Sequence, residues 1–353
     1  MQQIFLRGLG ITLLLNLLVK PATIFGVDVV MQNEIGLIPY GDFSAFLNFT
    51  FLFCMILDMG ITNYMTRLIA QHPHLIRQYS HQLFTLRMFL AVVYVIWTVS
   101  LFFLFGLPLN YIIHQISINT VNYVRAYTGG LMRFKLDAVL SVIERLVYLI
   151  LGLLLLYTTL VRPISLGWFV GIFVSSSFIS FLFAGFVYVS LVEFPRWKWN
   201  TIFFKAIFKQ SFPYALLVIL MMLNSRIDTV FIKLVHPDGA TQVSYYVQGF
   251  RLLDACWMFG ILFGGILLPI FSRLLKEKES VSGIMTNAFN LLISAGLLMV
   301  VLSIGTREIL FDALYKDATQ MTYDSWVFLS ISFLPMCFTL VFGTLLTANG
   351  SLR

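Results

Sequence analysis

The 353-residue sequence has few charged residues, which argues against a soluble domain, and few cysteines, which argues against a disulfide framework. Charged residues make up 11% of the chain, against about a quarter in soluble domains, while 59% of the residues are hydrophobic. The three cysteines, Cys54, Cys256 and Cys337, fall in apolar runs, where a thiol behaves as a small apolar side chain. The composition is that of an integral membrane protein, and it implies neither a disulfide framework nor a metal site.

Motifs for common catalytic chemistry are also missing. The sequence has no P-loop, no nucleophile elbow and no zinc-protease helix motif, so neither ATP-driven transport by this chain nor hydrolysis is supported. His72 and His74 have a spacing that metal ligands can have, but without Cys, Asp or Glu nearby a solvated loop is the better interpretation. We therefore predict no enzyme activity, no metal and no cofactor.

The hydrophobic residues form runs long enough to cross a membrane. A hydrocarbon core of about 30 Å requires about 20 apolar residues in a helix. Runs such as "ILGLLLLYTTL" are continuously apolar and do not alternate as barrel strands would, so the sequence predicts an all-α bundle. Ten spans are predicted, near 8–32, 43–66, 88–107, 109–131, 146–161, 166–192, 211–235, 243–270, 284–305 and 325–347.

Two of these spans need comment. The run that begins the chain is too long for a signal peptide, contains Lys20 and lacks a small-residue cleavage site, so it is predicted to be a retained first helix. Span 109–131 contains Asn, His and Arg, and it can cross a membrane only if its polar face points into the protein.

The distribution of positive charge predicts the orientation. With a cytoplasmic N-terminus, fifteen of the 23 Lys and Arg residues fall in inside loops, three in outside loops and five within spans. Because Lys and Arg concentrate on the cytoplasmic side, the loops at 67–87, 193–210 and 271–283 are predicted to be cytoplasmic. The net charge of +7 is then a topology signal, and no nucleic-acid partner is expected.

The sequence also repeats itself. Asp28, Tyr40 and Arg67 in the first half correspond to Asp228, Tyr246 and Arg273 in the second, and Tyr and Arg are 27 residues apart in both copies. Six spans separate the copies, so both run in the same direction, which predicts a parallel repeat of two halves related by an axis along the membrane normal. In each copy the arginine is interpreted as a helix stop at the cytoplasmic face.

This repeat predicts a plan of six plus six helices. Residues 1–192 would form an N-terminal six-helix bundle, residues 193–210 a cytoplasmic linker, and residues 211–353 a C-terminal bundle. With four spans, the second bundle is expected to be incomplete, and an inactive truncated fragment or a non-transporting scaffold stays among the alternatives.

Three segments resemble a known family. "YGDFSAFLNFTFLFCMILDMGITNYMTRLIAQHP" is similar to an early segment of bacterial polysaccharide exporters of the O-antigen flippase type, members of the multidrug/oligosaccharidyl-lipid/polysaccharide (MOP) superfamily. There a Tyr-Gly pair opens the second helix and Asp-x-Gly precedes a terminal arginine. "FKLDAVLSVIERL" and "FPYALLVILMMLNSRIDTVFI" resemble the starts of the fifth and seventh helices. The short linker between the third and fourth spans and the missing last helices of the usual twelve or fourteen depart from the pattern.

The resemblance implies a function in surface polysaccharide (lipopolysaccharide O-antigen) biosynthesis. Exporters of this type flip an undecaprenyl-pyrophosphate-linked oligosaccharide from the cytoplasmic to the periplasmic leaflet of the bacterial inner membrane, through a cavity between two six-helix bundles. The implied partners are this lipid-linked substrate, membrane lipids, a polysaccharide polymerase and glycosyltransferases.

The cations within spans are the candidates for binding a pyrophosphate, because ionisable residues in membrane spans are costly and commonly functional. They are Lys20, Arg125, Arg226, Lys233 and Arg251. Arginine presents a planar fork to phosphate oxygens, so Arg226 and Arg251 rank first, with Lys20 and Arg125 in support. Lys233 is expected to snorkel to the outer interface. The alternative is that the arginines only neutralise nearby acids within the bundle.

The acids within spans have two interpretations. Asp28, Asp228 and Asp254 are candidates for binding a coupling ion or for balancing the charge of the cations. The alternative for Asp28 and Asp228 is a structural role, in which they cap helices or pair near the interface. Asp58 and Gly60 are interpreted as architectural: Asp58 should find a partner on a neighbouring helix, and Gly60 should allow two helices to approach closely.

Two other functional classes share part of this pattern. A membrane glycosyltransferase or polymerase would need acidic catalytic residues in a sizeable outer loop, but the acids at 306–324 are scattered without a D-x-D motif. A cation-coupled multidrug antiporter of the related extrusion family would share the twelve-helix plan, but it should favour acidic cavities, whereas cations outnumber acids in the spans of this chain.

Overall fold

The computed structural model of the chain describes residues 2–71, 76–105, 109–131, 133–158, 163–192 and 194–349. These residues form helices and no strands, and they divide into an N-terminal unit, Met1–Val243, and a C-terminal unit, Ser244–Arg353. His72 and His74 lie outside the described residues. The division into six-helix halves and the superposition of the two repeats stay predictions.

The helices follow one another with short connections. In chain order they are α1 (Gln2–Thr23), the π-helical η1 (Ile24–Asp28), α2 (Val29–Ile35), α3 (Leu37–Leu52), α4 (Met55–Asp58), α5 (Ile61–Gln71), α6 (Ile76–Phe105), α7 (Asn110–Gly130), α8 (Phe134–Tyr157), α9 (Leu166–Val192), α10 (Thr201–Val235), α11 (Gly239–Glu277), α12 (Ser282–Leu314) and α13 (Gln320–Ala348).

The prediction of an all-α protein with about ten spans is confirmed. Among the described residues, seven helical segments are long and apolar enough to cross a membrane, and the bent helix α10 makes an eighth. The two remaining predicted spans, 109–131 and 243–270, correspond to the long helices α7 and α11.

Helix α7 shows how a polar segment fits among apolar ones. It packs against α9, α5 and α8 in the N-terminal unit. His114, Gln115, Ser117 and Asn119 are all buried on it. Its polar face therefore points into the protein, as the sequence required of this span.

The helix predicted at 43–66 is broken in the structure. Between α4 and α5, Met59 has a φ of 46° and Gly60 a φ of 72°, a left-handed backbone that side chains with a Cβ rarely adopt. A Cβ on Gly60 would lie 2.4 Å from the backbone nitrogen of Ala215 on α10. The predicted close approach of two helices at Gly60 is confirmed, and it is this contact with α10 that requires a glycine.

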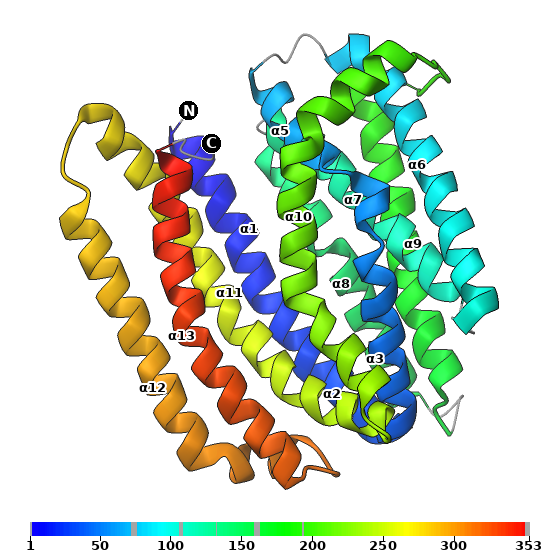
Figure 1. Ribbon diagram of the computed structural model, residues 1–353, viewed down its shortest axis with the longest axis vertical. Coiled ribbons are helices and arrows are strands. Elements are labelled where there is room, and N and C mark those ends of the chain that lie inside the picture. Colours follow the sequence, from blue (N-terminus) through cyan, green and yellow to red (C-terminus); the bar gives the residue numbers. More distant parts are fainter. Residues whose placement is uncertain are drawn as a thin grey trace. The chain divides into compact units, whose positions relative to one another are not determined.

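Helix α10 runs beside both parts of this broken helix, contacting α3 and α5 (Figure 1). It begins inside the segment predicted as a linker, because the Asn200 side chain accepts a hydrogen bond from the backbone N–H of Phe203 (3.0 Å) and caps the first turn. The helix bends by 41° between 201–216 and 218–235, one turn after Pro213.

In the C-terminal unit, α12 and α13 lie side by side and antiparallel (Figure 1). The hydroxyls of Ser303 and Ser330 hydrogen-bond across their interface at 2.7 Å, and Thr322 of α13 donates to Gln248 of α11 at 2.8 Å. Buried polar contacts of this kind fix the register of otherwise apolar helices.

Two arginines assigned to cytoplasmic loops lie inside helices instead. Arg87 belongs to α6 and Arg145 to α8, both within segments apolar enough to span a membrane. The loop assignment was wrong because a single charge was taken as the end of a span, whereas the helices continue past it. By the same criterion Lys135 lies in the candidate span 134–157, and Arg307, counted as outside, lies in 282–314, so the orientation stays a prediction.

Candidate functional site

The N-terminal unit contains a cavity of about 440 Å³, which we call the polar cavity. Its walls come from α4, α5, α7, α8 and α10. Helix α7 contacts α4, α5 and α8, and α10 contacts α4 and α5. It is lined by Asp58, Thr62, Asn63, Thr66, Asn119, Asn122, Arg125, Ala126, Gly129, Asp137, Val218 and Met222.

A buried charged network forms one side of the polar cavity. Arg87 on α6 donates through Nη1 to Asp58 Oδ1 at 2.7 Å, and through Nη2 to the backbone oxygen (3.1 Å) and the side chain of Asn119. The guanidinium also lies 4.6 Å from the ring centroid of Tyr123, a cation–π contact. Asp58 accepts further hydrogen bonds from the backbone and hydroxyl of Thr62. The prediction that Asp58 finds a partner on a neighbouring helix is confirmed.

A second ion pair lies on another side of the polar cavity. Arg125 on α7 donates through Nε to Asp137 Oδ1 at 3.0 Å and through Nη2 to Oδ2 at 3.4 Å, which is the fork-to-carboxylate geometry. Thr128 donates to the same carboxylate at 3.4 Å. Arg125, one of the predicted substrate-binding cations, therefore lines a cavity, but its charge is balanced by an acid from α8.

The remaining polar groups of the polar cavity are amides and hydroxyls. Asn63 and Asn122 are exposed, and within the described part of the chain their side chains form no hydrogen bond with the protein. An amide offers both donors and an acceptor. The cavity therefore presents unused hydrogen-bonding capacity of both kinds.

The other predicted cations lie outside the lining of this cavity. Arg226 on α10 is half-buried with its guanidinium 5.6 Å from the ring centroid of Phe51, and Lys20 on α1 is also half-buried. Arg251 is buried on α11 in the C-terminal unit, with 8% of its surface exposed. The proposed cationic cavity between the halves stays a prediction.

The predicted acids differ in their surroundings. Asp28 ends the π-helical turn η1 and accepts a hydrogen bond from the Tyr148 hydroxyl of α8 at 2.7 Å. π-Helical turns often occur at functional sites. Asp228 on α10 and Asp254 on α11 are exposed. Asp28 thus has a specific partner on another helix, which suits either a counter-charge or an ion-coupling role.

Lys233, predicted to snorkel to the outer interface, has an acidic partner on another helix. Its ammonium pairs with the carboxylate of Asp42 on α3, and both side chains are about one-third exposed (31% and 34%). Close by in sequence, a Cβ on Gly41 would overlap the backbone of Ala240. The predicted snorkelling of Lys233 to the outer interface stays a prediction, and the sequence did not show this pairing because the acid comes from α3, which packs against α10.

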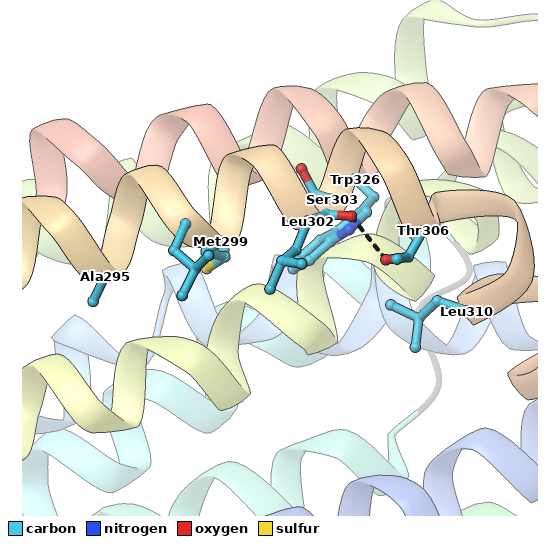
Figure 2. Close-up of a pocket in the computed structure, with 8 residues that line it drawn as sticks. Ala295, Met299, Leu302, Ser303, Thr306, Leu310 and Trp326 are labelled. Carbon is cyan, nitrogen blue, oxygen red and sulfur yellow. Dashed lines mark hydrogen bonds between the residues drawn. The ribbon is translucent and has the colours of Figure 1, made fainter.

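The C-terminal unit contains a pocket of a different kind, about 370 Å³ in volume, which we call the apolar pocket (Figure 2). Its lining residues come from α12 and from Trp326 of α13. They are Ala295, Leu298, Met299, Leu302, Ser303, Thr306, Leu310 and Trp326. The Thr306 hydroxyl donates to the backbone oxygen of Leu302 at 2.8 Å, so it adds little polarity to the pocket (Figure 2).

Several residues of the polar cavity were not singled out from the sequence. Asn119 and Asn122 precede Arg125, which was singled out, at intervals of three residues on α7, and this spacing is a signal that the sequence contained. Arg87 and Asp137 had no such signal, because their partners lie on other helices. From the sequence, Arg87 was counted among the cytoplasmic loop residues, and Asp137 had no assigned role.

Comparisons with known proteins agree with this architecture. A family model described as polysaccharide biosynthesis protein matches residues 5–275. A search of curated proteins gives no match. Among solved structures, the chain is similar to a multidrug resistance MATE family transporter of the MOP superfamily in an inward-facing conformation. The TM-score is 0.63 at 11% identity, over 95% of this chain and 81% of that chain, and at this identity the likeness concerns the fold alone. With the family model covering most of its length, the chain belongs to the polysaccharide biosynthesis protein family.

Proposed function

We propose that the chain is a flippase that moves an undecaprenyl-pyrophosphate-linked oligosaccharide from the cytoplasmic to the periplasmic leaflet of the bacterial inner membrane. The observation that carries the proposal is the polar cavity, which lies among the helices of a multi-pass membrane protein of the polysaccharide biosynthesis family. A sugar head group cannot cross hydrocarbon without replacement of its hydrogen bonds with water, and a cavity lined by amides, hydroxyls and ion pairs supplies them.

The pyrophosphate of the substrate needs cations elsewhere in the protein. Arg226 and Arg251 are the candidates, supported by Lys20, since arginine binds phosphate oxygens through two parallel hydrogen bonds. Arg226 already lies over the Phe51 ring and Arg251 is buried, so both are held by their surroundings. A glycosyltransferase would supply the lipid-linked substrate, and a polymerase would use the flipped product.

The energy source belongs to the same proposal. Asp28 is held by Tyr148 in a π-helical turn, and Asp228 occupies the matching place in the sequence repeat. A carboxylate in a membrane helix is a candidate for binding a coupling proton or cation. Asp254 would serve as a counter-charge near Arg251.

A cation-coupled multidrug antiporter is the second candidate, and the fold likeness to a MATE transporter favours it. Such a protein should bind organic cations in an acidic site. In the polar cavity, however, each lining acid has an arginine beside it, at 2.7 Å for Asp58 and 3.0 Å for Asp137.

Complementation distinguishes the two candidates. The full chain is expressed in a bacterial strain that lacks its own O-antigen flippase, and surface polysaccharide is scored together with the abundance of the protein in the membrane. The flippase proposal expects restored surface polysaccharide and no change in ethidium efflux. Efflux without restored polysaccharide at normal abundance would favour the antiporter, and neither activity at normal abundance would contradict both.

A further inference from the structure

We infer that the polar cavity is a subsite for an uncharged, hydroxyl-rich sugar of the transported lipid, and that the pyrophosphate binds elsewhere. The inference rests on the proposed function and refines it. It also changes the role first assigned to Arg125, which lines this cavity and was predicted to contact the pyrophosphate.

The charge balance of the polar cavity is the first reason. Asp58 is paired with Arg87 at 2.7 Å, and Asp137 with Arg125 at 3.0 Å. Among the described side chains, these two acids and two arginines balance one another, so they leave no net charge for a ligand to neutralise. A pyrophosphate or an acidic sugar would bring uncompensated negative charge into the cavity, and an organic cation would bring uncompensated positive charge.

The hydrogen-bonding groups are the second reason. Asn63 on α5 and Asn122 on α7 are exposed on helices whose neighbours span the membrane, and within the described residues their amides form no hydrogen bond with the protein. Each amide donates and accepts. A sugar hydroxyl also donates and accepts, whereas an ionised phosphate oxygen only accepts. The unused groups therefore match a hydroxyl-rich ligand.

The shape of the polar cavity is the third reason. Its volume of about 440 Å³ lies within the range of pockets that hold small ligands. Val218 and Met222 of α10 give it one apolar wall, which suits the C–H face of a sugar ring. Gly129 lines the cavity, and a Cβ placed there would meet no atom within 4 Å, so this part of the wall is open.

Binding to three lipids tests the inference. The full chain is purified in lipid nanodiscs, and its affinity is measured for undecaprenyl pyrophosphate, for undecaprenyl-pyrophosphoryl N-acetylglucosamine and for undecaprenyl-pyrophosphoryl glucuronic acid. The neutral glycolipid should bind about tenfold more tightly than the lipid without sugar, as one or two neutral hydrogen bonds would give. The acidic glycolipid should bind more weakly than the neutral one.

Variants then locate the sugar. Gly129→Leu fills the open wall, and Asn122→Leu removes an amide. Each variant should therefore lower the affinity for the neutral glycolipid to within about twofold of the affinity for the bare lipid. Their affinity for undecaprenyl pyrophosphate itself should not change. Gly171→Leu is the matched control: Gly171 lies on α9, outside the cavity lining, and a Cβ there also meets no atom within 4 Å.

The outcomes separate the inference from the proposed function. Equal binding of neutral glycolipid and bare lipid by the unmodified protein, tightest binding of the acidic glycolipid, or an equal loss of bare-lipid binding in the cavity variants would each overturn the sugar subsite while leaving the flippase proposal standing. Failure to bind any of the three lipids would overturn both.

Discussion

The polar cavity of the N-terminal unit and the apolar pocket of the C-terminal unit have similar volumes, about 440 and 370 Å³, but different chemistry. In the apolar pocket, the Ser303 and Thr306 hydroxyls donate to backbone oxygens of their own helix at 2.7 and 2.8 Å. In the polar cavity, the amides of Asn63 and Asn122 have no such partner among the described residues. In the apolar pocket the buried Trp326 Nε1 is a donor without a partner among the described residues, whereas the unpartnered amides of the polar cavity supply acceptors as well as donors.

One ion pair from each unit shows a difference in burial. Arg87 and Asp58 are 7% and 9% exposed and lie deep among packed helices, whereas Arg307 and Asp324 of α12 and α13 are 29% and 46% exposed. A buried pair is costly to break because the remaining charge cannot be solvated, while an exposed pair is screened by water. The following experiments test this contrast, in order of decreasing expected effect.

The largest effect is expected for Arg87→Met. It leaves Asp58 and the side chain of Asn119 buried without their donor, which should cost about 3–5 kcal/mol of stability. Thermal unfolding in detergent and the abundance of the protein in the membrane measure it. Combining Arg87→Met with Asp58→Asn removes the unpaired charge and should restore part of the loss. If Arg87→Met alone were as stable as the unmodified protein, the Arg87–Asp58 pair would be solvated.

Next come Arg226→Ala and Arg251→Ala, one in each unit. If these arginines bind pyrophosphate, losing a charge-assisted contact should cost about 2–3 kcal/mol of binding and abolish surface polysaccharide in the complementation assay. Lysine at either position should restore export only in part, because it lacks the bidentate fork. Normal export by both alanine variants, or failure only through loss of the protein from the membrane, would make the two arginines structural.

A smaller effect is expected for Gly60→Ala. The φ of 72° and the 2.4 Å approach of a new Cβ to the backbone of Ala215 should cost about 1–3 kcal/mol and push α5 away from α10. The same change at Gly171, which has open space on α9, should be neutral or slightly stabilising. Equal melting temperatures for the two variants would mean that α5 and α10 separate easily.

The smallest effect is expected for Arg307→Met. Its pair with Asp324 is partly exposed at the ends of α12 and α13, so the loss should lie between about 0 and 1 kcal/mol. The melting temperature should change far less than for Arg87→Met. An equal change in the two variants would remove the contrast between the buried and the exposed pair.

Much of the fold could be predicted from the sequence, because hydropathy acts locally. A run such as 166–192 must be a membrane helix whatever surrounds it, and the structure has α9 at Leu166–Val192. The same reasoning explains the errors at Arg87 and Arg145. A charge usually ends a span, and the sequence does not show that a partner on another helix allows the charge to remain inside.

The sequence by itself therefore determined the class of the protein, the approximate spans and the need for buried partners, since each follows from the cost of placing polar groups in hydrocarbon. Only the tertiary structure decided which partners meet. Asp58 and Arg87 are 29 residues apart on separate helices, and Lys233 and Asp42 are 191 apart. Their pairing depends on which helices pack together and on the break at Met59 and Gly60 that aims α5 at α10, and no local pattern of residues encodes that packing.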